Sequence, residues 1–209
     1  MGDLVLLETE VNPVMAKLLG GGIEITAVHN HLLRASPATF YMHIGGYGDP
    51  ARMAEAIRFA LAQSDTPLSA PAAATPPAID LDTAQLDQII GAKGQNNGGV
   101  YQFSVPRRDP IIESGMTVPA AMGSAHAINF QPTGGGNAAI TGDFVVTGDE
   151  VNPLIRTLRS NGIEVTAIHS HMLTEAPRLI FVHFWAIDNA LTLAKSLRAA
   201  LEKTAIANN

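Results

Sequence analysis

An internal repeat constrains this chain more than any other feature of its sequence. Residues 10–61 and 150–201 align without a gap at an offset of 140, and 19 of the 52 positions are identical. The match extends upstream, because GDLVL at 2–6 corresponds to GDFVV at 142–146. Since a sequence repeat of this kind encodes a repeated structural unit, the chain is expected to contain two related modules.

The two copies differ in how much sequence precedes the shared part. The second copy is preceded by a helix-like segment at 81–91, a strand-like segment at 98–107 and two further strand-like segments. We therefore predict the C-terminal half of a first module over 1–63, a Pro/Ala-rich linker over 64–80 and a complete second module over 81–209. The chain is expected to start inside the first copy. Its half-module either completes a sheet with the other copy or belongs to a longer natural chain.

The shared segment predicts the element order β-α-β-β-α, with a further strand before it. Asn152–Pro153 is typical of a helix start, and Gly162 of a helix end, as are Asn12–Pro13 and Gly22 in the first copy. Two β-rich stretches then flank a turn at Pro177, and an amphipathic helix follows over 190–203. This order predicts an α+β fold of ferredoxin-like sandwich modules, each an antiparallel sheet with helices on one face, repeated in tandem.

Composition excludes several classes of partner and cofactor. The net charge is −6 and no Lys/Arg cluster is longer than Arg107–Arg108, so nucleic acid is not an expected partner. No apolar run approaches the ~20 residues of a membrane span, and the N-terminus lacks the basic start of a signal peptide. The absence of cysteine excludes disulfides and thiolate metal sites. Histidine and carboxylate side chains are then the available metal ligands.

Six of the seven histidines lie in the repeat, three in each copy. A His-x-His pair on a strand presents two imidazoles on one face. A hairpin centred on its proline would place the third histidine opposite the second, and a register shifted by one residue would place it opposite the first. Both registers keep all three on one face, close enough to converge on one ion. We therefore predict a three-histidine site for zinc or another divalent transition metal in each copy, formed by His29, His31 and His43 and by His169, His171 and His183.

A structural interpretation of the same histidines stays open. Ile23, Ile25 and Ala27 have the same parity as His29 and His31, so the histidines continue what reads as the core face of the strand. They would then be semi-buried residues hydrogen-bonded to the backbone or to one another. Glu10 and Glu150, which precede the Asn-Pro pairs, are assigned mainly to stabilising the helix N-termini.

Several motifs together resemble one bacterial family. EVNPVMAKLLGGGIEITAVHNHLL, FYMHIGGYGDP, GGVYQFSVPR, INFQPTGGGNAAITGDFV and EVNPLIRTLRSNGIEVTAIHSHML are similar to the LppY/LpqO-type family, a domain of unknown function named after mycobacterial lipoproteins. The resemblance covers nearly the whole chain except the linker. It implies an exported protein, periplasmic or secreted, with two complete copies, and it implies no established activity.

Three functions are compatible with these features. The first is an exported metal-binding protein, with hydrolase or lyase chemistry through metal-bound water as one form. The second is a non-catalytic cell-envelope ligand-binding or scaffold module with structural histidines. The third is metal-free acid–base catalysis by the histidines. The expected partners are a second copy of the chain or the other repeat, and a small-molecule ligand.

Overall fold

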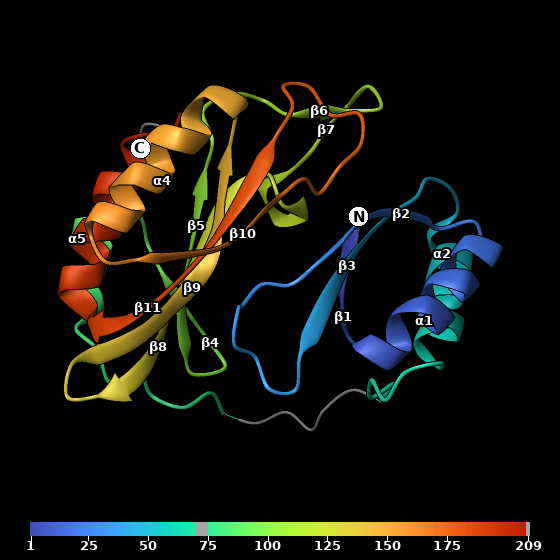
Figure 1. The fold of residues 1–209 in the computed structure, drawn as a ribbon, viewed down its shortest axis with the longest axis horizontal. Coiled ribbons are helices and arrows are strands. Elements are labelled where there is room, and N and C mark those ends of the chain that lie inside the picture. The colour runs from blue at the N-terminus through green and yellow to red at the C-terminus, as the bar shows by residue number, and fades with distance from the viewer. Residues whose placement is uncertain (70–74, 208–209) are drawn as a thin grey trace. The chain divides into compact units, whose positions relative to one another are not determined.

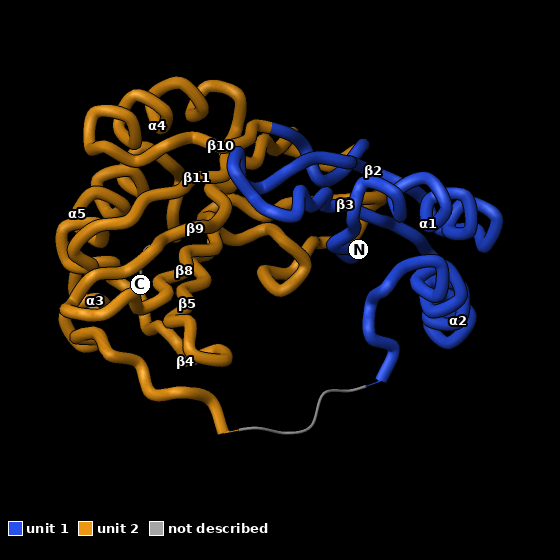
Figure 2. The backbone as a smooth tube through the Cα atoms, turned by 60° about the horizontal axis from the view of Figure 1, so that its bottom comes forward, with its two compact units in different colours: residues 1–73, 169–173 blue, residues 74–168, 174–209 orange. Residues whose placement is uncertain are grey.

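The structure, a computed structural model, describes residues 1–69 and 75–207 and divides into two compact units (Figure 2). Unit 1 consists of Met1–Ala73 and His169–Leu173. Unit 2 consists of Ala74–Ile168 and Thr174–Asn209. No helix in the described part of the chain is long and apolar enough to cross a membrane.

Unit 1 contains one three-stranded antiparallel sheet and two helices. The elements follow the order β1 (Gly2–Leu7), α1 (Glu8–Gly20), β2 (Glu24–His29), β3 (Thr39–Gly45) and α2 (Pro50–Leu61). The sheet order is β1-β3-β2. The core lies between the helices and one face of the sheet, and its buried members are Leu6, Val14, Leu18, Ile23, Met42, Ile44 and Ala60. The opposite face of this sheet is left for polar side chains.

Unit 2 contains a six-stranded sheet with the order β10-β11-β9-β8-β5-β4. Its strands are β4 (Gln95–Asn97), β5 (Val100–Pro106), β8 (Ala125–Gly134), β9 (Asn137–Val146), β10 (Glu164–His169) and β11 (Ile180–Asn189). Its helices are α3 (Thr83–Ile90), α4 (Gly148–Ser160) and α5 (Ala190–Leu201), with a 3₁₀ turn η1 (Ala120–Met122). A small hairpin joins β6 (Ile112–Glu113) to β7 (Met116–Thr117).

The helices of unit 2 cover one face of its sheet (Figure 1). Alternate residues of the central strands, such as Phe144 on β9 and Phe184 on β11, are fully buried in a core shared with Leu158 of α4 and Leu197 of α5. Because successive strand residues point to opposite faces, the residues between them lie on the face opposite the helices. That face carries Trp185, His183 and Asp143.

These elements confirm a mixed α/β fold with antiparallel sheets and helices. Both copies of the repeat have the order strand, helix, strand, strand, helix, with sheet orders β1-β3-β2 and β9-β11-β10. The expected helices at 81–91 and 190–203 correspond to α3 and α5. The Gly-rich stretch before β9 is a turn, in which Gly134, Gly135 and Gly136 all have positive φ.

The predicted helix starts at the Asn-Pro pairs are wrong. Helix α4 begins at Gly148 and helix α1 at Glu8, so Pro153 and Pro13 lie inside the helices. Each helix starts earlier because a glutamate side chain in its first turn accepts a hydrogen bond from the backbone N–H of the residue before the helix. The side chain of Glu150 accepts a hydrogen bond from the backbone N–H of Thr147 at 2.8 Å, and Glu10 does the same for Leu7. Thr147 followed three residues later by Glu150 is the capping-box pattern.

The helix ends are as expected. Gly22 and Gly162 follow α1 and α4 with φ of 78° and 75°, a conformation that suits glycine. The predicted linker over 64–80 includes residues 70–74, which lie outside the described residues. On either side of them, residues 64–69 and 75–80 contain no helix or strand.

Candidate functional site

A bulge in β2 decides which sheet face carries the histidines of the first copy. Ile25 pairs with Ile44 of β3, whereas Ala27 pairs with His43, so Thr26 is left over between the two pairs. One extra residue reverses the alternation of side chains beyond it. The prediction that His29 continues the apolar face of Ile25 is therefore wrong. His29 lies beyond the bulge, on the face opposite the core.

The pairing of β2 with β3 uses neither predicted register. His29 lies opposite Tyr41 and Ala27 lies opposite His43, which makes His29 and His43 diagonal neighbours. The connection from β2 to β3 spans residues 30–38, too long for a tight turn to fix the register. The strands fix it instead. The two Nε2 atoms of His29 and His43 lie 2.8 Å apart, and His43 is almost fully buried, with 6% of its surface exposed.

His31 lies beyond the end of β2, so the predicted His-x-His pair is not on a continuous strand. Its ring nevertheless stacks on Tyr41, with ring centroids 3.3 Å apart and planes 6° apart. The ring centroids of His29 and His31 are 5.0 Å apart. One ring nitrogen from each of His29, His31 and His43 lies within 4.8 Å of the others. The structure thus brings the first predicted triplet together.

The hydrogen-bond partners of this triplet indicate where its protons lie. The Nδ1 of His29 is 3.1 Å from the carbonyl oxygen of Asn30, which can only accept, so Nδ1 carries a proton and Nε2 presents a lone pair. The Nδ1 of His43 is 3.9 Å from the Asp3 carboxylate, which lies directly opposite on β1. That negative charge favours a proton on Nδ1 of His43. The two Nε2 atoms lie within hydrogen-bond distance, so either one of them donates a proton to the other or a metal ion takes the place of that proton.

Asp3 and Tyr41 complete the surroundings of the triplet. Burial raises the pKa of the Tyr41 hydroxyl, and the charge of Asp3 raises it further, against a hydrogen bond with Thr39. The phenol therefore stays neutral at physiological pH. The Asp3 carboxylate contributes a negative charge beside the imidazoles, an arrangement that favours a cation there.

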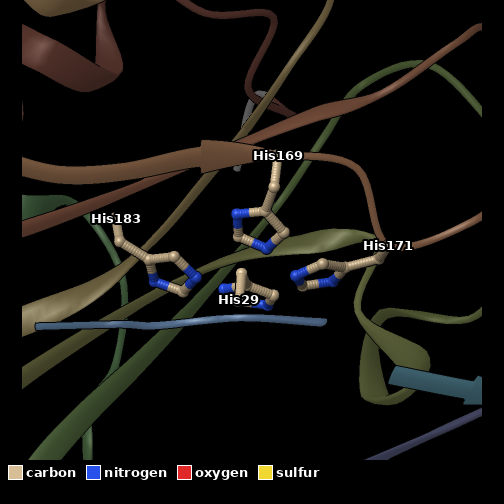
Figure 3. Close-up of side chains that lie close together, drawn as sticks. All are labelled: His29, His169, His171 and His183. Carbon is tan, nitrogen blue, oxygen red and sulfur yellow. The ribbon is translucent and has the colours of Figure 1, made fainter. Parts of the chain in front are cut away.

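Two histidines of the second copy also belong to unit 1. His169 is the last residue of β10, and His171 follows it. The His169 ring centroid lies 3.4 Å from that of His29, and the His171 centroid lies 3.7 Å from that of His43. Figure 3 shows His169 and His171 beside His29. One ring nitrogen from each of these three residues lies within 4.8 Å of the others.

His183 belongs to unit 2, so the second predicted triplet is divided between the units. His183 lies on β11 opposite Asp143 of β9. Its Nδ1 is 2.7 Å from an Asp143 carboxylate oxygen and 3.0 Å from the carbonyl oxygen of Gly142. Both are acceptors, so Nδ1 of His183 carries a proton.

The aspartates are functional candidates that sequence reasoning missed. Asp3 and Asp143 occupy equivalent positions of the repeat, and each lies opposite the third histidine of its copy. The signal was available in the shared GD pair of GDLVL and GDFVV. Each carboxylate places a negative charge beside Nδ1 of its histidine, and carboxylates commonly stand next to metal-ligating imidazoles.

The seventh histidine has a structural role. His126 is fully buried, accepts a hydrogen bond at Nδ1 from the backbone N–H of Val145, and contacts Thr204 through Nε2. Burial lowers the pKa of His126 to about 3, helped by the nearby Arg107 and opposed by Glu150. His126 is therefore neutral in the native protein.

Glu150 is likewise structural, as expected. Arg107 lies 2.7 Å from its carboxylate, and the backbone N–H groups of Thr147 and Ala205 donate to it. Burial alone would raise the pKa of Glu150, but these partners outweigh burial and lower it. Glu10 accepts the equivalent hydrogen bonds from Leu7 and Asp65.

Comparisons with known proteins give a family and little else. Residues 1–63 and 84–203 match a family described as "Domain of Unknown Function (DUF1259)". No curated protein matches the chain. Among solved structures, the trimeric bacterial microcompartment shell protein PduB is similar at 14% identity, over 96% of this chain and 76% of that one, with a TM-score of 0.23. At that score the likeness carries no argument about fold or assembly.

Proposed function

The chain belongs to the DUF1259 family, whose description names no activity, and from the chain's own residues we propose that it is a metal-binding protein. The proposed centre is the triplet His29, His31 and His43 of unit 1, with a divalent transition metal such as zinc as the ion. Three imidazoles leave a coordination position for water or a small ligand.

The observation that carries this proposal is the 2.8 Å separation of the Nε2 atoms of His29 and His43. A proton shared between the two Nε2 atoms would form one hydrogen bond and would involve no other histidine. A metal ion would satisfy the pair and also engage His31, which has a ring nitrogen within 4.8 Å of both. Two nitrogen ligands of a tetrahedral zinc ion lie roughly 3.3 Å apart, so the rings would separate by about 0.5 Å to admit it.

The support of the two rings matches what a metal needs. Metal-bound imidazoles donate their other ring N–H to a carbonyl or a carboxylate. His29 has the carbonyl of Asn30 in this position, and the carboxylate of Asp3 lies 3.9 Å from Nδ1 of His43, where it contributes a nearby negative charge. This arrangement favours the metal hypothesis over semi-buried histidines that only fill space.

The finer expectations from the sequence belong to the same proposal. By the repeat, His169, His171 and His183 form a second set of ligands. By resemblance to the LppY/LpqO-type family, the protein is exported to the periplasm or secreted. We also propose that the modules are ferredoxin-like and that the chain forms a homo-oligomer. In the competing function, a non-catalytic ligand-binding or scaffold module, the histidines are structural.

Metal content of protein without a histidine tag tests the proposal. After incubation with Zn²⁺, Ni²⁺ or Cu²⁺ and gel filtration, the wild type should retain the ion stoichiometrically. His29→Ala and His43→Ala should weaken binding by more than the roughly 10–100-fold that loss of an outer-sphere partner costs. Glu55→Gln, which changes an exposed residue of α2, is the matched control and should bind normally. Wild type that retains no ion, or histidine variants that bind like the control, would overturn the proposed metal centre.

A further inference from the structure

The sheet of unit 2 has a cavity on the face opposite its helices. It has a volume of about 230 Å³ and is lined by Asn97, Val100, Asn129, Gln131, Ala139, Thr141 and Trp185. This is below the roughly 300–1,000 Å³ of pockets for drug-sized ligands, so it suits a molecule of about one ring.

Strand register explains the shape of this cavity. Gln102, Asn129, Thr141 and Trp185 form one row across β5, β8, β9 and β11, since each is the direct partner of the next. In the adjacent row, Gln131 of β8 lies opposite Ala139 of β9. The short side chains of β9, Ala139 and Thr141, thus form a floor between Trp185 on one side and the amides of β8 on the other. The two walls are two strand spacings apart, about 9.5 Å.

The chemistry of the lining selects for a neutral, hydroxyl-rich ligand. None of the seven lining residues is charged, so the cavity offers no ion pair to an acid or a base. Three primary amides, from Asn97, Asn129 and Gln131, offer both donors and acceptors, which matches hydroxyl groups that both donate and accept. The Asn129 amide nitrogen donates to the backbone oxygen of Thr141 at 3.3 Å, which leaves its carbonyl oxygen for a ligand. Trp185 offers an apolar ring face.

We propose that this cavity is a carbohydrate-binding site that takes one neutral pyranose residue, stacked by its C–H face on Trp185 and hydrogen-bonded to the amides of Asn129 and Gln131. The site is independent of the proposed metal centre. It is also specific to unit 2, because the counterparts of Trp185 and Thr141 in the first copy are Gly45 and Met1.

The chain contains one tryptophan, so its fluorescence reports on this site alone. Intact protein is titrated with glucose, galactose, N-acetylglucosamine, maltose and cellobiose. At least one of these sugars should give a saturable change in emission, with an affinity on the order of millimolar. Loss of one hydrogen bond in Asn129→Ala or Gln131→Ala should weaken that binding by about 5–10-fold. Calorimetry should detect no binding to Trp185→Ala.

Gln88→Ala is the matched control, because it removes an exposed amide from α3, whose helix packs on the other face of the sheet. It should bind like the wild type. Gln131 is exposed, so its variant keeps the test valid if Asn129→Ala does not fold. A flat response to all five sugars, equal affinities in wild type and both amide variants, or a response to adenosine instead of sugars would overturn the proposal.

Discussion

Gly142 lies at the meeting point of two strands and one histidine. Its carbonyl oxygen receives the Nδ1–H of His183, and its Cα has no room for a side chain, because a Cβ there would overlap the carbonyl oxygen of Ala127 on β8. Since the neighbouring atom is backbone, a side chain could be admitted only by moving the two strands apart.

Gly142→Ala should therefore destabilise the protein by about 3 kcal/mol, the upper end of the usual cost of overpacking. Gly148→Ala is the matched control, because a Cβ at Gly148 meets no atom within 4 Å, and it should be nearly neutral. Urea denaturation of the three proteins compares their free energies of unfolding. Equal stability of the two variants would show that the strands separate at little cost.

Asp3 gives a second prediction for a single residue. Asp3→Asn keeps the size of the side chain but removes the charge that favours a proton on Nδ1 of His43. Metal affinity should fall by about 10–100-fold, the typical effect of losing an outer-sphere partner. Isothermal titration with Zn²⁺ measures the change. Metal affinity that stays at the wild-type value would show that Asp3 does not contribute to metal binding.

For single residues, the sequence indicated the histidines but not the aspartates that lie beside them. His29, His31 and His43 stand out because they recur in a repeat without cysteine. Asp3 lies 40 residues from His43, and the two meet only through the pairing of β1 with β3. Local patterns do not specify which residues face each other across strands so distant in sequence.

Among the elements, β8 is tied to its neighbours through His126. The ring accepts from the backbone of β9 at Nδ1 and contacts Thr204, after α5, through Nε2. A proton added at Nδ1 would face the N–H of Val145, which is the geometric reason why the native protein disfavours the charged form.

Stability should therefore fall in mild acid. The pKa of His126 is about 3 in the folded protein and about 6.5 in the unfolded chain, so below pH 6.5 only the unfolded chain takes up this proton. The part of the free energy of unfolding that depends on neutral His126 is present above about pH 6.5 and declines as the pH falls toward 3. The decline between pH 6.5 and 5 is about 2 kcal/mol.

Urea denaturation in the presence of a chelator, at both pH values, measures this loss. His126→Gln keeps an acceptor and a donor but cannot titrate, so it should lack this part of the pH dependence. The comparison with wild type cancels the titration of the other histidines. If both proteins lose stability equally, His126 is not the group responsible.

Helices and most strands could be predicted, because their periodicity and caps are local. The bulge in β2 and the start of α1 could not be predicted from the same local patterns. The bulge at Thr26 depends on how β2 pairs with β3. Helix α1 runs through Pro13 because the carboxylate of Glu10, rather than Asn12, satisfies the start of the helix.

For the whole molecule, the sheet of unit 1 ends at β1. β1 pairs with β3, and no strand of the described residues lies on its other side, whereas the equivalent strand β9 is flanked there by β8. An uncovered sheet edge favours pairing with another chain. A symmetric dimer through two β1 strands is the simplest closed form.

Light scattering after gel filtration should accordingly give the mass of a dimer. Val5→Lys places a charge on β1 at an exposed position and should shift the protein to a monomer. Leu19→Lys, at an exposed position of α1, is the control and should leave the dimer intact. A monomer in the wild type, or a dimer that persists in Val5→Lys, would contradict pairing through β1.

The division of the chain into units has a consequence for synthesis. Unit 1 includes His169–Leu173, which come more than a hundred residues after α2. A chain made from its N-terminus would ordinarily fold its first domain while the rest is still being translated. Here the ribosome must deliver β5, β8, β9 and β10 before the first unit has all its parts. The hydrophobic core of the N-terminal unit can form early, because its buried residues all lie between Leu6 and Ala60, whereas its last five residues join only after most of the chain has emerged.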